Sequence, residues 1–196
     1  MDWKRRVFFL YEEVRSATDS VEAWRRWRAV RDELFARHPQ SPLTAEGREE
    51  FNGLSYFDHD PAARAEADVH ETEPRMYEIP TSGDGAPYAF TRIALLEFEL
   101  GGDACELELY WLEGYGGGLF LPFRDATSGA ETYGACRYVL DTVKGADLGA
   151  TGDGRLVLDF NFSYNPSCSY DPRWVCPLAP PPNRLSVPVR AGERLA

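Results

Sequence analysis

Positive charge is scarce in this chain, and lysine is nearly absent. Lys4 and Lys144 are the only lysines in 196 residues, and 21 basic residues stand against 32 acidic ones, for a net charge of −11. An acidic protein of this kind repels nucleic acid and anionic lipid surfaces. We therefore expect neither nucleic acid nor a membrane among its partners.

The sequence also lacks a long apolar run. No stretch approaches the roughly 18 consecutive apolar residues that a membrane-spanning helix requires. Near the N-terminus, Glu12, Glu13 and Arg15 interrupt the apolar run before it reaches the length of a signal peptide. These absences predict a cytoplasmic protein.

Cysteine is rare, with four residues in the chain, and too sparse for a dense disulfide framework. Cys105 and Cys136 fall in strand patterns and are expected to be buried. Cys168 and Cys176 share one loop and could pair, bind a metal or supply a nucleophile. Their spacing does not match a zinc pattern such as CxxC, so we predict reduced, packed thiols and no metal site. A disulfide is disfavoured in the cytoplasm.

What the chain does contain is enough apolar and aromatic surface for a core, at 43% and 13% of residues. Its length indicates one domain over residues 1–196. Up to residue 66 the apolar residues recur at helical spacings of three and four. Asp19 is placed to cap a helix, and Ser41-Pro42 to begin a short one that ends near residue 50.

From residue 67 the apolar period changes to two, which indicates strands. The clearest hairpin turns at Gly101-Gly102, between a strand containing Leu96 and a strand containing Leu107. Further strands are predicted at residues 75–79, 119–123, 132–140, 156–164 and 185–189. The class is therefore α+β, with N-terminal helices packed on an antiparallel β-barrel or sandwich of about eight strands.

One candidate site segment covers residues 119–141. If residues 132–140 form a strand, Glu131, Tyr133 and Arg137 point to one face and could hold a polar ligand. An interior Arg137 would then need a carboxylate partner, either Glu131 or Asp159. The alternative is a solvated outer face with a cross-strand ion pair.

The second segment, residues 158–184, is the most unusual part of the chain, with six prolines and two cysteines. Prolines and aromatics favour a loop of one fixed shape, and ordered loops often carry functional sites. On the strand that enters it, Asp159 and Asn161 either face water or line a polar cavity. Turn capping by the asparagine and aspartate side chains is an equally simple explanation.

Both segments resemble a known family. The matching residues are Phe123, Asp125, Thr127-Ser128-Gly129, Glu131-Thr132-Tyr133-Gly134 and Arg137-Tyr138 in the first, and Asp159-Phe160-Asn161, Tyr164-Asn165-Pro166, Cys168, Tyr170, Cys176-Pro177-Leu178 and Asn183-Arg184-Leu185 in the second. With Ser41-Pro42-Leu43 and residues 51–57, they resemble the family called domain of unknown function 1684. The resemblance covers nearly the whole chain but implies no activity. Pro182 departs from the pattern, which usually has an acidic residue there.

Three functional hypotheses follow. The first is a β module that binds a small polar molecule in a pocket between residues 125–137 and 159–183, lined by Arg124, Glu131, Tyr133, Arg137, Asp159, Asn161, Tyr164, Asn165 and Trp174. The second is a hydrolase-like enzyme whose catalytic candidates are Asp125, Glu131, Asp159 and Cys168. The third gives these motifs a purely structural role. The sequence indicates no particular cofactor or oligomeric state.

Overall fold

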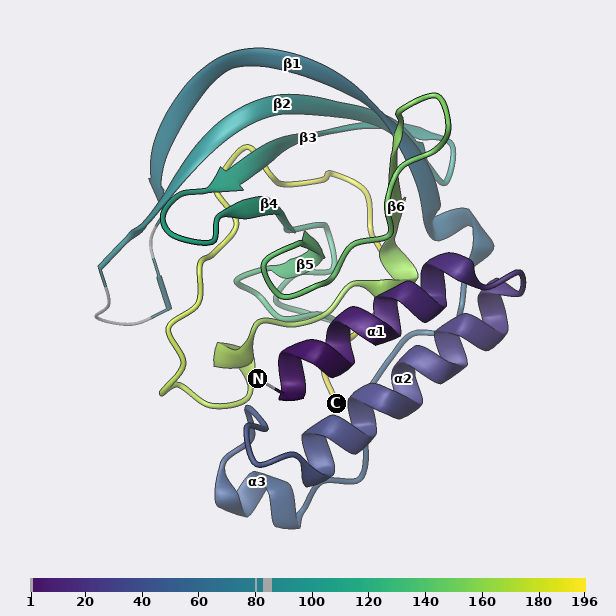
Figure 1. The fold of residues 1–196 in the computed structure, drawn as a ribbon, viewed down its shortest axis with the longest axis vertical. Helices are drawn as coiled ribbons and strands as arrows, with labels where there is room; N and C mark the ends of the chain where they lie inside the picture. Colours follow the sequence, from purple (N-terminus) through teal and green to yellow (C-terminus); the bar gives the residue numbers. More distant parts are fainter. Residues whose placement is uncertain (1, 80, 83–85) are drawn as a thin grey trace.

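A computed structural model describes residues 2–79, 81–82 and 86–196 of the chain. Within these residues three helices come first, α1 (Asp2–Ser16), α2 (Ser20–Arg37) and α3 (Ala45–Glu49). The strands follow as β1 (Arg64–Ile79), β2 (Tyr88–Leu100), β3 (Asp103–Leu112), β4 (Gly118–Phe123), β5 (Arg137–Asp141) and β6 (Leu156–Asp159). Figure 1 shows α1 and α2 side by side below the arching strands β1, β2 and β3.

Local sequence signals place the first two helices as expected. The Asp19 carboxylate accepts hydrogen bonds from the backbone N–H groups of Val21 and Glu22, and so caps α2. The short α3 begins later than predicted, at Ala45, and its cap is Thr44 rather than Ser41. After Asp60, however, the chain makes only one 3-10 turn, η1 (Pro61–Ala63), and β1 already begins at Arg64.

All strand pairs are antiparallel, and the sheet order is β5-β4-β3-β2-β1-β6. The two edges of this sheet meet beyond β6, where Tyr138 and Tyr164 exchange backbone hydrogen bonds of 2.9 and 3.0 Å. The sheet is thus a nearly closed barrel. The β2–β3 hairpin turns at Gly101 and Gly102, both with positive φ, as predicted.

Two apolar clusters hold the fold together. The first fills the barrel with residues from all six strands and from the C-terminal segment, including Leu96, Leu121 and Val189. The second joins α1 and α2 to the sheet, and Trp27 at its centre is fully buried against Tyr56 and Phe162. The α+β class is confirmed. The N-terminal helices contact the barrel through the second cluster.

The count of about eight strands is wrong; among the described residues there are six. The pattern at residues 75–79 is the end of the single long β1 rather than a strand of its own. Residues 185–189 lie beside Arg124 and Ala126 through isolated backbone bonds but do not extend into a strand. Pro188 within that segment lacks the N–H donor that a ladder would need.

Two predicted strands near the site segments are also shorter than expected. Residues 132–136 contain only an isolated bridge at Thr132 and a bend at Gly134-Ala135. Because β5 begins only at Arg137, the expected common face of Glu131, Tyr133 and Arg137 does not exist. Strand β6 ends at Asp159, whose carboxylate caps the 3-10 turn η2 (Phe160–Phe162). A short polar side chain that bonds the nearby backbone can thus end a strand, even where the alternation of apolar and polar residues continues.

No helix among the described residues is long and apolar enough to cross a membrane.

Candidate functional site

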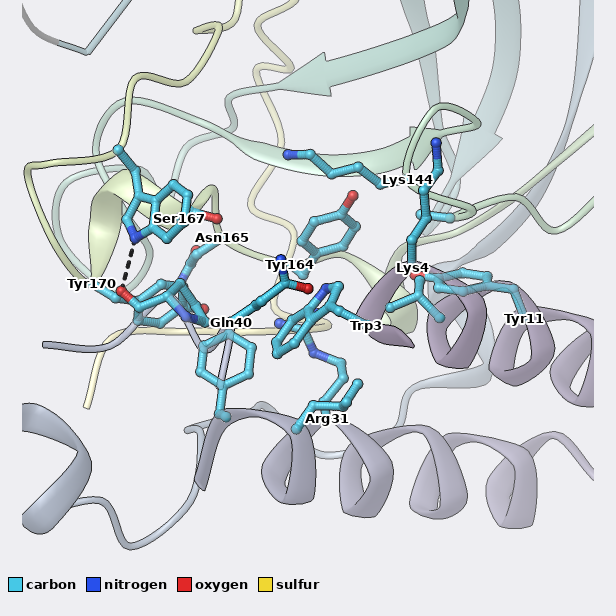
Figure 2. Close-up of a pocket in the computed structure, with 16 residues that line it drawn as sticks. Trp3, Lys4, Tyr11, Arg31, Gln40, Lys144, Tyr164, Asn165, Ser167 and Tyr170 are labelled. Carbon is cyan, nitrogen blue, oxygen red and sulfur yellow. Dashed lines mark hydrogen bonds between the residues drawn. The ribbon is translucent and has the colours of Figure 1, made fainter. Parts of the chain in front are cut away.

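A cavity of about 390 Å³ lies between the N-terminal helices and the loop that follows β6. Figure 2 shows its lining residues. Apolar and aromatic side chains form most of its wall, namely Trp3, Val7, Tyr11, Leu34, Phe35, Pro42, Ala146, Tyr164, Tyr170 and Trp174. Its polar lining consists of Lys4, Arg31, Gln40, Lys144, Asn165 and Ser167. A concave, mostly apolar space with a few convergent polar groups is typical of small-molecule sites.

Helix α1 supplies one wall because its apolar residues recur every four positions. Trp3, Val7 and Tyr11 therefore lie on one face of the helix, and all three line the cavity. Trp3 packs against Phe35 of α2, with ring centroids 5.8 Å apart and the ring planes tilted by 52°. The two helices thus form a continuous aromatic wall.

The opposite wall is the loop after β6, and hydrogen bonds attach it to the helical segment. The Trp174 indole donates to the Pro42 carbonyl at 3.0 Å, marked by the dashed line in Figure 2. The Arg173 guanidinium donates to the neighbouring Leu43 carbonyl at 3.4 Å. The loop is therefore held against residues some 130 positions earlier in the chain.

Arg31 reaches the cavity from α2 and is only 12% exposed at its side chain. Its guanidinium lies over the rings of Trp27, Phe35 and Tyr164, with distances of 4.8–5.3 Å to the ring centroids. It donates to the Glu193 carboxylate at 2.8 Å. A buried arginine with a carboxylate and three aromatic faces is firmly positioned.

Glu193 is the centre of a buried polar group behind the cavity. Besides Arg31, its carboxylate accepts hydrogen bonds from the Tyr170 hydroxyl and from the backbone N–H of Asn165. Burial raises the pKa of Glu193 above its usual range, and the Arg31 charge opposes that shift. Burial likewise raises the pKa of Tyr170, so this phenol remains a donor. The group fixes three of the residues that line the cavity.

Asn165 is held through its backbone N–H, but its side-chain oxygen lacks a partner among the described residues. The residue is 6% exposed, lines the cavity, and follows Tyr164 where the loop begins. Its Oδ1 atom has no hydrogen-bond partner among the described residues. Buried acceptors are normally satisfied, so this oxygen is available to a donor on a bound molecule.

Both lysines of the chain line this cavity. In Figure 2 Arg31 rises from α2 on the side away from Lys4 and Lys144. The ammonium of Lys144 lies 3.8 Å from the Asp141 carboxylate, and that of Lys4 lies over the Phe8 ring. In a protein with a net charge of −11, this is a local concentration of positive charge.

The residues of the predicted pocket do not all lie here. Tyr164, Asn165 and Trp174 line the cavity. Arg137 is 1% exposed and instead pairs with Asp125, at 2.8 Å, rather than with Glu131 or Asp159. The turn that follows β4 carries Asp125 beneath the arginine, a placement that strand alternation could not predict.

Glu131 has its own partner at the surface. It forms a bidentate pair with Arg190, with N–O distances of 2.8–3.1 Å. Arg124 holds residues 183–185 through its backbone N–H and C=O groups, at 2.8 Å each. Tyr133 of the first motif also contacts the loop, with its hydroxyl 3.8 Å from the Cys168 sulfur.

Asp159 and Asn161 serve mainly to stabilise local structure. The Asp159 carboxylate accepts from the backbone and side-chain amides of Asn161, at 3.0 and 2.8 Å. Asn161 also exchanges two hydrogen bonds with the Asp60 backbone. Burial raises the pKa of Asp159, which lines a second cavity of about 320 Å³ near Ala17. The two site segments thus contact each other at Arg124, Tyr133 and Tyr138 rather than through Glu131, Arg137, Asp159 and Asn161.

All four cysteines are free thiols. No group of three or more histidine, cysteine, aspartate or glutamate side chains within residues 2–79, 81–82 and 86–196 is arranged to hold a metal ion.

Sequence reasoning missed the helical half of the cavity, above all Trp3, Lys4 and Arg31. The sequence did contain one relevant feature, namely that Lys4 and Lys144 are its only lysines. Their positions, 140 residues apart, gave no indication that the fold brings them to one cavity.

Fold and site together define an α+β protein whose N-terminal helices and barrel loops enclose an aromatic cavity. The chain belongs to the family described as "Protein of unknown function (DUF1684)", whose sequence profile matches residues 49–194. This confirms the family resemblance. Trp3, Lys4 and Arg31 lie before the matched region, so the profile does not include the helical wall of the cavity.

A solved structure with the same fold comes from Haloarcula marismortui. It is the solution NMR structure of an uncharacterized protein, 36% identical to this chain, with a TM-score of 0.61. The similarity covers 86% of this chain and 90% of that one. A comparison with curated proteins gives no match. The fold and family are therefore established, and the function must be argued from the cavity.

Proposed function

We propose that the protein binds a small organic anion with an aromatic or otherwise apolar body in the cavity between α1, α2 and the loop of residues 164–174. One observation carries this proposal: a cavity of about 390 Å³ has aromatic walls and includes both lysines of the chain in its lining. The volume lies within the range of roughly 300–1,000 Å³ that small-molecule sites occupy.

The walls select the body of the ligand. Trp3, Phe35, Tyr170 and Trp174 present rings that can bury a flat or aliphatic group, and water leaving these surfaces favours binding. The aromatic walls are already supported by one another and by the Trp174–Pro42 hydrogen bond, so little ordering is needed when a ligand enters.

The cations select the charge of the ligand. Glu193 compensates Arg31, whereas Lys4 and Lys144 extend from different elements at the cavity and can converge on one carboxylate, sulfonate or phosphate group. Asp141 offsets part of the Lys144 charge, at 3.8 Å. Charge-assisted hydrogen bonds to an anion are about twice as strong as neutral ones.

Asn165 adds a requirement for a donor. Its buried Oδ1 is unpartnered within the described residues, so a ligand that carries a hydroxyl or N–H group beside its apolar body would satisfy it. A hydroxylated or nitrogen-containing aromatic acid has all three features.

Binding is favoured over acid–base catalysis because the buried carboxylates are used within the fold. Asp125 bonds Arg137 and Thr127, and Asp159 bonds Asn161. A small anion is also the partner that the local charge suits, since the acidic surface as a whole opposes nucleic acid. We place this activity in the cytoplasm, where the four thiols remain reduced.

Replacing both lysines, Lys4→Gln with Lys144→Gln, should weaken binding of naphthoate about tenfold. Each exposed ammonium contributes up to about 1 kcal/mol to an ion pair, and about 1.4 kcal/mol together corresponds to a factor of ten. The neutral analogue naphthylmethanol should bind the double variant and the natural protein equally. Isothermal titration calorimetry at low ionic strength measures both.

The matched control is Arg155→Gln, which removes a surface charge that is paired with Glu66 and Asp153 and does not line the cavity. It should leave naphthoate binding unchanged. Equal loss in Arg155→Gln and in the lysine double variant would show a general effect of net charge. Failure of the natural protein to bind naphthoate or any related aromatic acid would contradict the proposal.

A further inference from the structure

Two thiols lie together beside the cavity loop. Cys168 is in the 3-10 turn η3 (Ser167–Ser169) and is half-buried, whereas Cys176 is 4% exposed. The Cys176 side chain is a hydrogen-bond partner of Cys168, and the Tyr133 hydroxyl lies 3.8 Å from the Cys168 sulfur. The two family motifs therefore contact each other at a cysteine pair.

Backbone hydrogen bonds fix both cysteines. The Cys176 N–H donates to the Ser82 hydroxyl at 3.0 Å, and the Ser82 N–H donates to the Cys176 carbonyl at 3.1 Å. Next to Cys168, the N–H and hydroxyl of Ser169 both donate to the Pro166 carbonyl. These hydrogen bonds hold the backbone in place at Cys176 and next to Cys168.

The environments of the two thiols differ in a way that suits a division of roles. The hydrogen bond from Cys176 lowers the pKa of Cys168 to about 6, helped by Ser82 and Tyr133 and opposed by burial. The same thiol–thiol hydrogen bond, together with burial, raises the pKa of Cys176. Cys168, the more exposed of the two, is therefore the thiol that ionises more readily, and the buried Cys176 is the one that keeps its proton.

The other cysteines show what a packed thiol looks like in this fold. Cys136 is fully buried, contacts the Pro177 carbonyl, and burial raises its pKa to about 12. Burial also raises the pKa of Cys105. Cys168 is more exposed than Cys136, and it differs from both cysteines in having the Tyr133 hydroxyl and the Cys176 thiol beside its sulfur.

We propose that Cys168 and Cys176 form a peroxide-reactive dithiol in which Cys168 attacks the oxidant and Cys176 resolves the product. The Cys168 thiolate attacks one oxygen of a hydroperoxide, the O–O bond breaks, and hydroxide or alkoxide leaves with the electron pair. The resulting Cys168 sulfenic acid then reacts with the Cys176 thiol to give a disulfide and water.

This pair is a site distinct from the cavity, and the proposal does not depend on what the cavity binds. The disulfide would close the loop between residues 168 and 176, which carries Tyr170 and Trp174 of the cavity wall. Reduction by an external thiol would restore the starting state.

The first test compares alkylation of individual cysteines by iodoacetamide, followed by mass spectrometry of the digested protein. At pH 6 half of the Cys168 population is thiolate, and after allowing for the lower nucleophilicity of a weakly basic thiolate it should react about 20-fold faster than an ordinary thiol of pKa near 9. Its rate should reach half of its maximum near pH 6. Cys105 is the internal control and should show no such rise below neutral pH.

The second test adds a slight excess of hydrogen peroxide and counts free thiols. The natural protein should lose two thiols and recover both with dithiothreitol. Cys176→Ser should instead retain a sulfenic acid at Cys168 that dimedone traps, and Cys168→Ser should lose none under the same conditions. Cys105→Ser, the control variant, should still form the disulfide.

Slow alkylation of Cys168 at pH 6, at the rate of Cys105, would overturn the proposal even if a variant failed to fold, because it is measured on the natural protein. Peroxide treatment that leaves all four thiols free, or that oxidises Cys105 as readily as Cys168, would also overturn it.

Discussion

Replacing Arg137 by leucine is expected to lower the free energy of unfolding by about 3–5 kcal/mol, because breaking a buried ion pair leaves an uncompensated charge. Arg137 and Asp125 are 1% and 0% exposed at their side chains and lie 2.8 Å apart. The guanidinium also donates to the carbonyls of Val189, Ala191 and Glu193. Leucine leaves the carboxylate and three carbonyls without their donor.

Urea denaturation followed by tryptophan fluorescence measures this loss. The matched control is Arg190→Leu, because Arg190 also pairs with a carboxylate, that of Glu131, but is 59% exposed at its side chain. It should cost about 0.5 kcal/mol or less, as exposed pairs contribute little. A similar loss of unfolding free energy in the two variants would mean that the buried hydrogen bonds of Arg137 to the C-terminal segment do not stabilise the fold.

Gly192→Ala is expected to be the second severe substitution. Gly192 has φ +74°, and an added Cβ would lie 2.6 Å from the Phe160 carbonyl oxygen and in contact with the Ser163 hydroxyl. The left-handed conformation costs about 1–2 kcal/mol for a residue with a side chain, and overpacking adds about 1–3 kcal/mol. We expect a total loss of about 2–5 kcal/mol in urea denaturation.

Two other glycines separate these contributions. Gly102 has φ +90° with open space around it, so Gly102→Ala should show the conformational cost alone. Gly152 has open space and no positive φ, so Gly152→Ala should be nearly neutral. If Gly192→Ala costs no more than Gly102→Ala, the close approach of the C-terminal segment to Phe160 and Ser163 is not required.

These two positions explain why the C-terminal segment matters to the cavity. Gly192 lets the chain pass close to Ser163, and the Glu193 N–H donates to the Ser163 carbonyl at 2.9 Å. Arg137 holds the carbonyls on both sides of the glycine. Glu193 is thereby placed to bond Arg31 and Asn165 behind the cavity.

Elements with strong local signals were predictable from the sequence. The Asp19 cap, the short helix after Ser41-Pro42 and the Gly101-Gly102 hairpin each depend on residues close together in the chain. Strand ends were less predictable, because the side chain of Asp159 turns the chain into η2 although apolar alternation continues to Tyr164.

Contacts between distant residues were the least predictable part of the site. The sequence indicated that Arg137 needs a carboxylate if it is buried, but the choice of Asp125 depends on the turn after β4. The loop of residues 164–174 was expected to cover a pocket between the two motif segments, whereas Tyr164, Asn165 and Trp174 line a cavity against the helices. Its other wall, from Trp3 to Phe35, exists only because the helices pack beside that loop.

Acylation of the two lysines tests the central claim most directly, because every lysine of this chain lines the cavity. The protein is treated with a small amine-reactive ester, and modification of Lys4 and Lys144 is followed by mass spectrometry with added N-acetyl-lysine amide as the reference. Saturating naphthoate should slow modification of both lysines several-fold, whereas naphthylmethanol should protect them less. Unchanged rates at both lysines, under conditions where calorimetry shows naphthoate bound, would contradict binding of the anion in this cavity.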